Sequence, residues 1–381
     1  MDFSLNSDQE AFVDRARTFA RERVQPAAAH IDEAGEYPRA LVAEAAAIGL
    51  MAVNIPVEFG GAGRDYVTYA LAMEAVSHAS ATLAVILSVN NSLVAEPILE
   101  HGTDEQRAIW LARLASGNCI GAFALSEADA GSDAANQSAT AREAGGDYVI
   151  NGTKVWVANA EVADVAIVFA STDPGARSRG ISAFLVPLDT PGITRHPQDS
   201  LGVRGLGCMD LQLQDVRVPA SARIGEAGRG FRLAMRALEG GRIAIAAQAL
   251  GIGMAALDQA LGYARRREAF GQTIGSFQAV QFQLADLAVD LEAARVLVWR
   301  AASMHDHLGR APLEAAMAKL HASEAAHRAA DRAMQIQASE GYRRGSTVER
   351  LFRDVRAAEI YQGTSEVQRM VIAERLLDRQ R

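Results

Sequence analysis

Glycine and histidine patterns are the first features of the sequence that could do chemistry. Gly251, Gly253 and Ala256 fit the G-x-G-x-x-A pattern that seats a dinucleotide pyrophosphate at the start of a helix. That pattern requires a preceding strand, whereas the residues RIAIAAQAL before Gly251 read as a helix. His305 and His307 are too close in sequence to share one helix face, and no histidine pair has H-E-x-x-H spacing. We therefore expect no nucleotide site at these glycines and no catalytic metal.

Four polar segments together make a far more specific pattern. They are FALSEADAGSD from Phe123 to Asp133, WVAN from Trp156 to Asn159, REAFG from Arg267 to Gly271, and IYQGTSEVQR from Ile360 to Arg369. In this order and spacing the chain closely resembles the acyl-CoA dehydrogenase family, nearest to its short-chain and short-branched-chain members. The resemblance extends over essentially the whole chain. It implies an FAD-dependent oxidoreductase of fatty acid or amino acid degradation that introduces an α,β double bond into a short-chain acyl thioester.

The resemblance implies that the first two segments, with part of the last, hold the flavin ring. The expected ring contacts are Phe123, Leu125, Ser126, Trp156, Val157, Ala158, Thr364 and Glu366. The turn after Phe123 would offer backbone groups and the Ser126 hydroxyl to the pyrimidine edge, and Trp156 would cover the ring with a flat apolar surface. Relatives usually carry Thr where this chain has Ala158, so one hydrogen bond near flavin N5 is expected to be absent.

The resemblance implies six further FAD contacts, three of which require an oligomer. They are Arg267, Phe270, Gln278, Gln335, Ala338 and Ser339. The first three resemble the set that reaches the FAD of a neighbouring subunit, with the guanidinium paired to the pyrophosphate. The last three stand where the family has Q-x-x-G-G, whose glycines let the backbone approach the adenosine half. Ala and Ser are small replacements, so we expect FAD to be retained but held more weakly, in a homotetramer.

Substrate contacts follow from the same resemblance. The expected residues are Ser132, Glu239, Arg242 and Gly363, with the Glu239–Arg242 tetrad opening a helix beside the pantetheine arm. The acyl group would arrive as a thioester of CoA or of a carrier protein. The electrons would pass to an electron-transfer flavoprotein. Acyl chain length cannot be read from these residues.

The expected general base is missing from the last segment. Dehydrogenation of a thioester needs a carboxylate that takes the α-proton while the flavin takes the β-hydride. In most of the family this base is the Glu of a Tyr-Glu-Gly-Thr tetrad, whereas this chain has Gln362 at that position. A neutral amide has negligible basicity, so Gln362 marks the base position without supplying a base. Its backbone N–H is still expected to polarise the thioester carbonyl.

No other acid in the sequence is a convincing replacement. Some relatives carry the base just before Arg242, where this chain has Gly241. Glu239 would face away around the same helix, and Glu366 better matches a flavin contact. Three explanations stay open: an engineered Glu→Gln variant that traps substrate, a divergent member that catalyses a different or non-redox reaction on an acyl thioester, and a catalytically silent subunit.

Helical and strand patterns divide the chain into three predicted domains. A helical domain covers 1–116, a β-barrel-like domain 117–228 and a four-helix bundle 229–381, which makes a mainly α fold with FAD between the last two. Helices are expected at 39–50, 65–79, 81–100, 104–115, 231–267, 276–308, 311–340 and 366–377. Another helix is expected from a Ser7–Glu10 capping box to Pro26.

Composition excludes several other classes of function. The chain has 46 acidic against 38 basic residues, a net charge of −8, which disfavours a nucleic-acid surface. Two cysteines cannot build a disulfide framework, and they favour a reducing compartment. No signal peptide is recognisable, and no run approaches the roughly 18 apolar residues of a membrane span. We therefore expect a cytoplasmic protein that does not enter the membrane.

Overall fold

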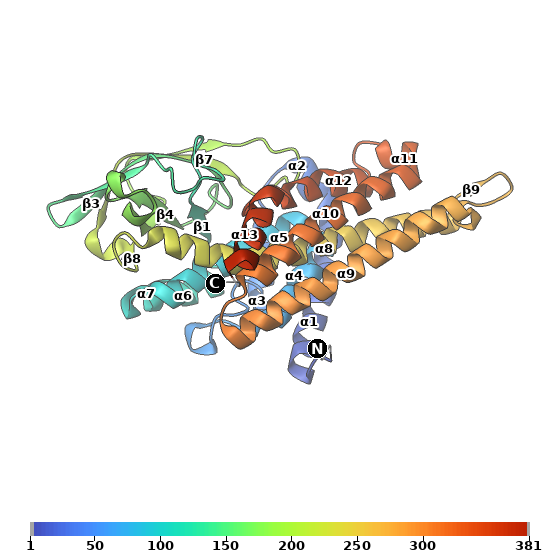
Figure 1. The fold of residues 1–381 in the computed structure, drawn as a ribbon, viewed down its shortest axis with the longest axis horizontal. Coiled ribbons are helices and arrows are strands. Elements are labelled where there is room, and N and C mark those ends of the chain that lie inside the picture. The colour runs from blue at the N-terminus through green and yellow to red at the C-terminus, as the bar shows by residue number, and fades with distance from the viewer. Residues whose placement is uncertain (1–3, 379–381) are drawn as a thin grey trace.

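A β domain lies at one end of a long set of helices (Figure 1). The computed structural model describes residues 4–378, so the extreme ends of the first and last predicted domains, 1–3 and 379–381, lie outside the described residues. The element order is helical, then β, then helical again, as the sequence predicts. In Figure 1 the β domain is green, and the C-terminal helices, yellow to red, extend away from it.

Helices fill the N-terminal third. They are α1 (Ser7–Phe19), α2 (Gln25–Ala34), α3 (Arg39–Ala47), α4 (Tyr66–Ala79), α5 (Ala81–Ser88), α6 (Glu96–His101) and α7 (Asp104–Ala115). The π-helical turns η1 (Ala20–Val24) and η3 (Val89–Ala95) join α1 to α2 and α5 to α6 without a break. The first capping box uses Asn6 and Gln9, one residue before the predicted pair, because Asn caps a helix as well as Ser does.

The middle of the chain forms a sheet of eight strands. They are β1 (Gly121–Ala124), β2 (Thr140–Ala144), β3 (Asp147–Val157), β4 (Val165–Ser171), β5 (Ile181–Pro187), β6 (Ile193–Pro197), β7 (Met209–Pro219) and β8 (Arg223–Ile224). The order is β6-β7-β3-β2-β4-β5-β8, and β1 pairs in parallel with β4. Every residue of β4 is buried, so β4 anchors β1 against the core of this domain.

Long helices make up the C-terminal part. They are α8 (Gly230–Arg266), α9 (Gln278–Leu308), α10 (Pro312–Gln337), α11 (Ser339–Tyr342), α12 (Thr347–Ala358) and α13 (Ser365–Asp378). A hairpin of β9 (Glu268–Ala269) and β10 (Gln272–Thr273) joins α8 to α9. The helix α12 was not predicted from the sequence, although Ser346 and Glu349 have capping-box spacing and the Ser346 side chain accepts a hydrogen bond from Glu349 N.

Glycines in α8 allow close helix packing rather than nucleotide binding. A Cβ at Gly251 would lie 2.9 Å from the backbone nitrogen of His78 in α4. A Cβ at Gly253 would lie 3.0 Å from the Cα of Ala326 in α10. The residues before Gly251 are helical, as predicted, so the strand that a dinucleotide fingerprint requires is absent from this stretch.

Among residues 4–378, two helical stretches are long and apolar enough to cross a membrane by length and composition, Ala81–His101 and Gly230–Arg266. Their most apolar windows are 89% and 83% buried inside the molecule. Such burial is what the core helices of a folded domain show. It favours the prediction that neither stretch enters a membrane.

Candidate active site

The turn after β1 and the end of β3 come together at one edge of the β domain. Val155 N donates to the Ser126 carbonyl at 2.9 Å, which brings the Phe123–Ser126 turn beside Trp156. The Phe123 ring packs on Phe169 of β4, with 4.9 Å between centroids. Two of the four polar segments therefore meet in space.

A bulge in β3 turns the Trp156 indole outward. The pairing of β3 with β7 shifts register between Lys154 and Val157, and Trp156 itself has φ +57°. Its indole is left 57% exposed, while Val157 is buried. Ala158 is half-buried and carries no hydroxyl. A large flat apolar surface exposed beside a polar turn is suited to cover a planar ligand.

A buried ion pair fixes the Phe123–Ser126 turn from below. Lys154 is fully buried, and its Nζ donates to Glu127 Oε1 at 2.7 Å and to the Leu125 carbonyl at 3.1 Å. Glu127 also accepts from Ser138 N at 2.7 Å. Burial would raise the pKa of Glu127, but the charge of Lys154 and these hydrogen bonds outweigh it and lower that pKa. Burial lowers the pKa of Lys154 to about 8, so the pair is ionised at neutral pH.

The Tyr361–Thr364 turn between α12 and α13 has a strained backbone held by side chains. Gln362 has φ +54° and Gly363 has φ +98°. The Gly363 carbonyl accepts from Lys319 Nζ and from Gln368 Nε2, both at 2.8 Å. The Gln362 carbonyl accepts from Arg242 Nε at 3.4 Å. In residues 4–378 the backbone N–H of Gln362 donates no hydrogen bond, so it is available to a ligand oxygen.

The two positions at which the family can carry a base lie against each other. A Cβ at Gly241 would collide with the Gln362 amide oxygen and would lie 3.1 Å from Leu93 Cδ2. That amide oxygen is buried and has no hydrogen-bond partner among the described residues. Gly241 therefore makes the room that the Gln362 side chain fills. The site has a buried acceptor without a donor where a carboxylate was expected.

The Glu239–Arg242 tetrad does not open a helix, contrary to the prediction. It lies in the interior of α8, which begins at Gly230, because the residues from Gly230 onward already continue the apolar helical pattern. Glu239 is buried, and its carboxylate accepts from Ala311 N and pairs with Arg236 at 3.5 Å and Arg310 at 3.3 Å. It is thus engaged by its own chain and points away from Gln362.

The remaining predicted residues of this region lie at the surface of the turns. Ser132 is exposed in the loop that follows Glu127. Thr364 Oγ1 caps α13 by accepting from Val367 N at 3.4 Å, and Glu366 is exposed in the first turn of α13. Within residues 4–378 no group of three His, Cys, Asp or Glu side chains is placed to hold a metal.

Six predicted contacts lie far from this edge of the β domain. Arg267 follows the end of α8, and Phe270 lies in the turn of the β9–β10 hairpin. Gln278 begins α9, Gln335 lies in the last turn of α10, and Ala338 and Ser339 lie at the junction of α10 with α11. In Figure 1 the hairpin and α11 lie at the end of the molecule opposite the β domain. Phe270 is 95% exposed, so the hairpin presents it to solvent in a single chain.

Models of three acyl-CoA dehydrogenase domains match the chain in order. The N-terminal domain matches residues 6–118, the middle domain 122–216 and the C-terminal domain 228–377. Human mitochondrial short-chain specific acyl-CoA dehydrogenase is 48% identical over 374 residues, which cover 98% of this chain and 91% of that protein. This chain belongs to the acyl-CoA dehydrogenase family.

Solved structures agree with the family assignment. Butyryl-CoA dehydrogenase from Megasphaera elsdenii superposes with a TM-score of 0.97 at 39% identity, covering 99% of this chain and 100% of that one. A glutaryl-CoA dehydrogenase from Mycobacterium smegmatis in complex with FADH2 superposes with a TM-score of 0.93 at 31% identity, covering 98% of this chain and 95% of that one. The mainly α fold with a central β domain is therefore the acyl-CoA dehydrogenase fold, as predicted.

Three residues that hold the two turns of the site from behind, Lys154, Gln368 and Lys319, were not predicted from the sequence. Lys154 stands two residues before Trp156, and a lone lysine in the apolar run KVWV was the available signal. Gln368 lies inside the quoted IYQGTSEVQR segment, yet nothing in its spacing shows that it bonds Gly363. Lys319 is fully buried on α10, and only the folded chain brings it to that carbonyl.

Ala338 departs from the family pattern at a backbone conformation that suits glycine. It caps the end of α10 with φ +52° and ψ −130°, and its side chain is exposed. A Cβ is disfavoured in this region, at a cost of about 1–3 kcal/mol. The chain thus adopts at Ala338 a backbone conformation that glycine would adopt freely.

We expect Ala338→Gly to stabilise the chain by about 1 kcal/mol, because it removes the strain at positive φ. Chemical denaturation would measure this gain. Ala108→Gly in the exposed interior of α7 is the matched control, and it should destabilise by about 1 kcal/mol. Equal destabilisation by both changes would show that Ala338 is not strained.

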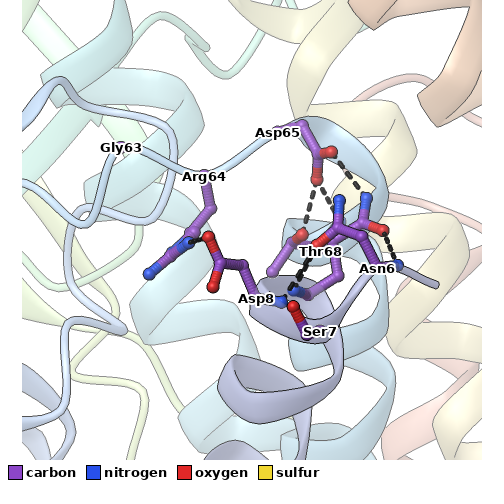
Figure 2. A pocket seen from close by; sticks show the side chains of 8 residues that line it. Asn6, Ser7, Asp8, Gly63, Arg64, Asp65 and Thr68 are labelled. Atoms are coloured by element: carbon purple, nitrogen blue, oxygen red, sulfur yellow. Dashed lines mark hydrogen bonds and ion pairs between the residues drawn. The ribbon is translucent and has the colours of Figure 1, made fainter.

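The pocket in Figure 2 lies on another part of the chain. It has a volume of about 410 Å³ and is lined by Asn6, Ser7, Asp8, Gln9, Gly63, Arg64, Asp65 and Thr68. Its polar groups bond to one another, since Gln9 Nε2 donates to Asp65 Oδ2 at 2.7 Å and Thr68 N donates to Asp65 Oδ1 at 2.8 Å. The pocket joins the starts of α1 and α4 and contains no predicted site residue.

Proposed function

We propose that this chain is an FAD-dependent dehydrogenase that introduces an α,β double bond into a short-chain acyl thioester. The observation that carries the proposal is the Tyr361–Thr364 turn. Its carbonyls are held by Arg242, Lys319 and Gln368, so the free backbone N–H of Gln362 is fixed in place. A fixed N–H donor suits a thioester oxygen whose negative charge grows as a proton leaves.

The residues at the edge of the β domain fit FAD. The exposed Trp156 indole offers a stacking surface, and the Phe123–Ser126 turn beside it offers backbone and hydroxyl groups. Bound FAD would supply the acceptor for the hydride that leaves the acyl chain. The chain's own residues would bind and orient the thioester and move the proton.

A homotetramer would complete the FAD site. The β9–β10 hairpin, whose turn exposes 95% of Phe270, lies at the end of the molecule opposite the β domain, which suits a contact with a second copy. Phe282, Val289 and Val296 are exposed at seven-residue intervals on α9 and form an apolar stripe. Such a stripe is typical of a helix that packs against another helix in an assembly.

We expect Val289→Asp to reduce the assembly to smaller species and to lower the FAD content of the purified protein. Its side chain is 70% exposed in one chain, and a charge there would oppose burial between helices. Light scattering and flavin absorbance measure the two effects. Val57→Asp is the matched control at a valine that is 73% exposed elsewhere. An unchanged mass and flavin content for Val289→Asp would contradict the assembly.

The finer assignments rest on family resemblance. The substrate would be an acyl thioester of CoA or of a carrier protein, and an electron-transfer flavoprotein would collect the electrons. A net charge of −8 and only two cysteines suit a cytoplasmic enzyme without nucleic-acid or membrane partners.

Anaerobic bleaching of the flavin by butyryl-CoA and by a branched thioester of similar size tests the proposal. The chain as it stands is compared with Gln362→Glu. Bleaching in either form supports a dehydrogenase. If neither form bleaches although flavin is bound, the proposal is overturned, and a non-redox or catalytically silent member of the family remains. Purified protein that neither carries nor takes up FAD overturns the cofactor assignment.

A further inference from the structure

The structure brings a carboxyl group near Gln362 from an element that carries none of the four polar segments. Glu96 begins α6, directly after the π-helical turn Val89–Ala95. A Cβ at Gly240 of α8 would lie 2.9 Å from Glu96 Oε2. Since Gly240 precedes Gly241, against which Gln362 packs, Glu96 and Gln362 contact consecutive residues of one helix.

The helix that carries Glu96 also contacts the Gly241 position. Leu93, one turn before Glu96, would lie 3.1 Å from a Cβ at Gly241, which is the space that Gln362 fills. Ala95 and Pro97 are buried, whereas Glu96 between them keeps part of its surface accessible. The carboxyl group itself is desolvated by burial and lies against Gly240, the residue before the one that Gln362 contacts.

The other acids near the turn are engaged or face outward. Glu239 is held by two arginines and a backbone N–H. Asp354 accepts from Val203 N at 2.6 Å, and Glu359 pairs with His327 at 2.9 Å. Glu366 is exposed on α13. Glu96 makes no ion pair among the described residues, and its carboxylate accepts a hydrogen bond from the hydroxyl of Tyr66.

The surroundings of Glu96 suit a group that exchanges a proton. The Tyr66 hydroxyl from α4 donates to both carboxylate oxygens, and the His305 ring from α9 stacks on Tyr66 with 3.8 Å between centroids. Glu100 on α6 and Arg236 and Glu239 on α8 also face it. Burial raises the pKa of Glu96 to about 8, against the hydrogen bond of Tyr66, which lowers it. A carboxyl group poised near the working pH can both accept and release a proton.

We propose that Glu96 is the catalytic carboxylate of this chain, which takes the proton from the acyl group in place of the base missing at Gln362. The proposal rests on the proposed dehydrogenase function. In the step, an acyl C–H bond breaks and its proton moves to a Glu96 oxygen. The electron pair stays on the acyl group as an enolate, whose oxygen the N–H of Gln362 holds. FAD, when bound, would supply the acceptor for the hydride of the neighbouring carbon, whose departure completes the double bond.

Exchange of acyl protons with solvent tests Glu96 without relying on turnover. The holoenzyme is mixed anaerobically with butyryl-CoA in D2O, and mass spectrometry measures the deuterium gained by the acyl chain. We expect Glu96→Gln to slow this exchange by about 10²–10⁴-fold with the flavin still bound. Glu105→Gln, an exposed charge change on α7, is the matched control and should leave exchange unaltered.

The pH profile and a second variant separate proton transfer from folding. The carboxylate must be ionised to accept a proton, so exchange should rise with pH towards a half-maximum near the pKa of about 8, and Glu96→Gln should abolish this rise. Glu96→Asp keeps an acid on a shorter arm and should retain slow exchange with the same direction of pH dependence, even where Glu96→Gln loses stability. Flat profiles in both the wild type and Glu96→Asp would overturn the proposal.

The outcomes distinguish this inference from the dehydrogenase assignment. Suppose that Gln362→Glu bleaches its flavin while the unaltered chain shows neither bleaching nor proton exchange. This result would support the dehydrogenase assignment and contradict the role of Glu96. Exchange by Glu96→Gln at the wild-type rate would also contradict the role of Glu96 and leave the dehydrogenase assignment intact. Loss of both activities in every form would overturn the function on which the inference rests.

Discussion

In a chain that carries Glu96→Gln, the second change Gln362→Glu is expected to restore flavin bleaching by butyryl-CoA by about 10²–10⁴-fold. Glutamate has the shape of glutamine, so it fits the room that Gly241 leaves. The buried amide oxygen of Gln362 has no partner, and a carboxylate there adds basicity without breaking a hydrogen bond. The backbone hold by Arg242, Lys319 and Gln368 is unchanged.

Stopped-flow absorbance of the anaerobic holoenzyme measures this rescue. Gln214→Glu in the Glu96→Gln background is the matched control, because it adds the same charge at an exposed position of β7. Rescue by Gln362→Glu but not by Gln214→Glu, both in the Glu96→Gln background, would show that positions 96 and 362 serve one proton transfer. A double variant as slow as Glu96→Gln would show instead that Glu96 acts through structure and not as a base.

Lys154→Met is expected to destabilise the chain by about 3–5 kcal/mol and to strip it of flavin. The change leaves Glu127 buried without its cation, while the Leu125 carbonyl loses its donor. The Phe123–Ser126 turn, which would face the flavin edge, then loses the hydrogen bond that fixes its backbone. Denaturation curves and the flavin-to-protein absorbance ratio measure the two effects.

A compensating change separates the cost of the lone charge from the loss of the lysine. Glu127→Gln added to Lys154→Met removes the buried charge and still lets an amide oxygen accept from Ser138 N. Most of the lost stability should return. If the single and double variants unfold alike, the buried ion pair does not set the cost, and packing around Lys154 does.

The sequence predicts the elements and the segments of the site, because both depend on local pattern. Helical spacing locates α4, α7, α8 and α9 to within a few residues, and alternation locates the strands. The four polar segments carry the Trp156 edge and the Gln362 turn as continuous runs. A family with strong motifs can therefore be recognised without coordinates.

Contacts between residues that are far apart in the sequence cannot be predicted from local patterns. Glu96 and Lys319 lie far from Gln362 in sequence, and nothing in their own segments marks them. They reach the site because α8 presents Gly240 without a side chain and because α10 places Lys319 against Gly363. The helix α12 buries Val348, Leu351 and Val355 at helical spacing, so its signal was present in the sequence although the helix was not predicted. The roles of Glu96 and Lys319 depend on which elements pack together, and not on the sequence pattern within one element.

One long helix connects two sites in the proposed assembly. The helix α8 spans 37 residues, or about 55 Å, with Gly240, Gly241 and Arg242 near its start and the β9–β10 hairpin at its end. Each copy would thus contain one proton-transfer site and would contribute its β9–β10 hairpin to the FAD site of another copy. Two inactive chains, one altered at Glu96 and one at Arg267, should therefore regain part of their activity when co-expressed. Mixed tetramers would contain sites built from the intact half of each, so the protein would show complementation between alleles.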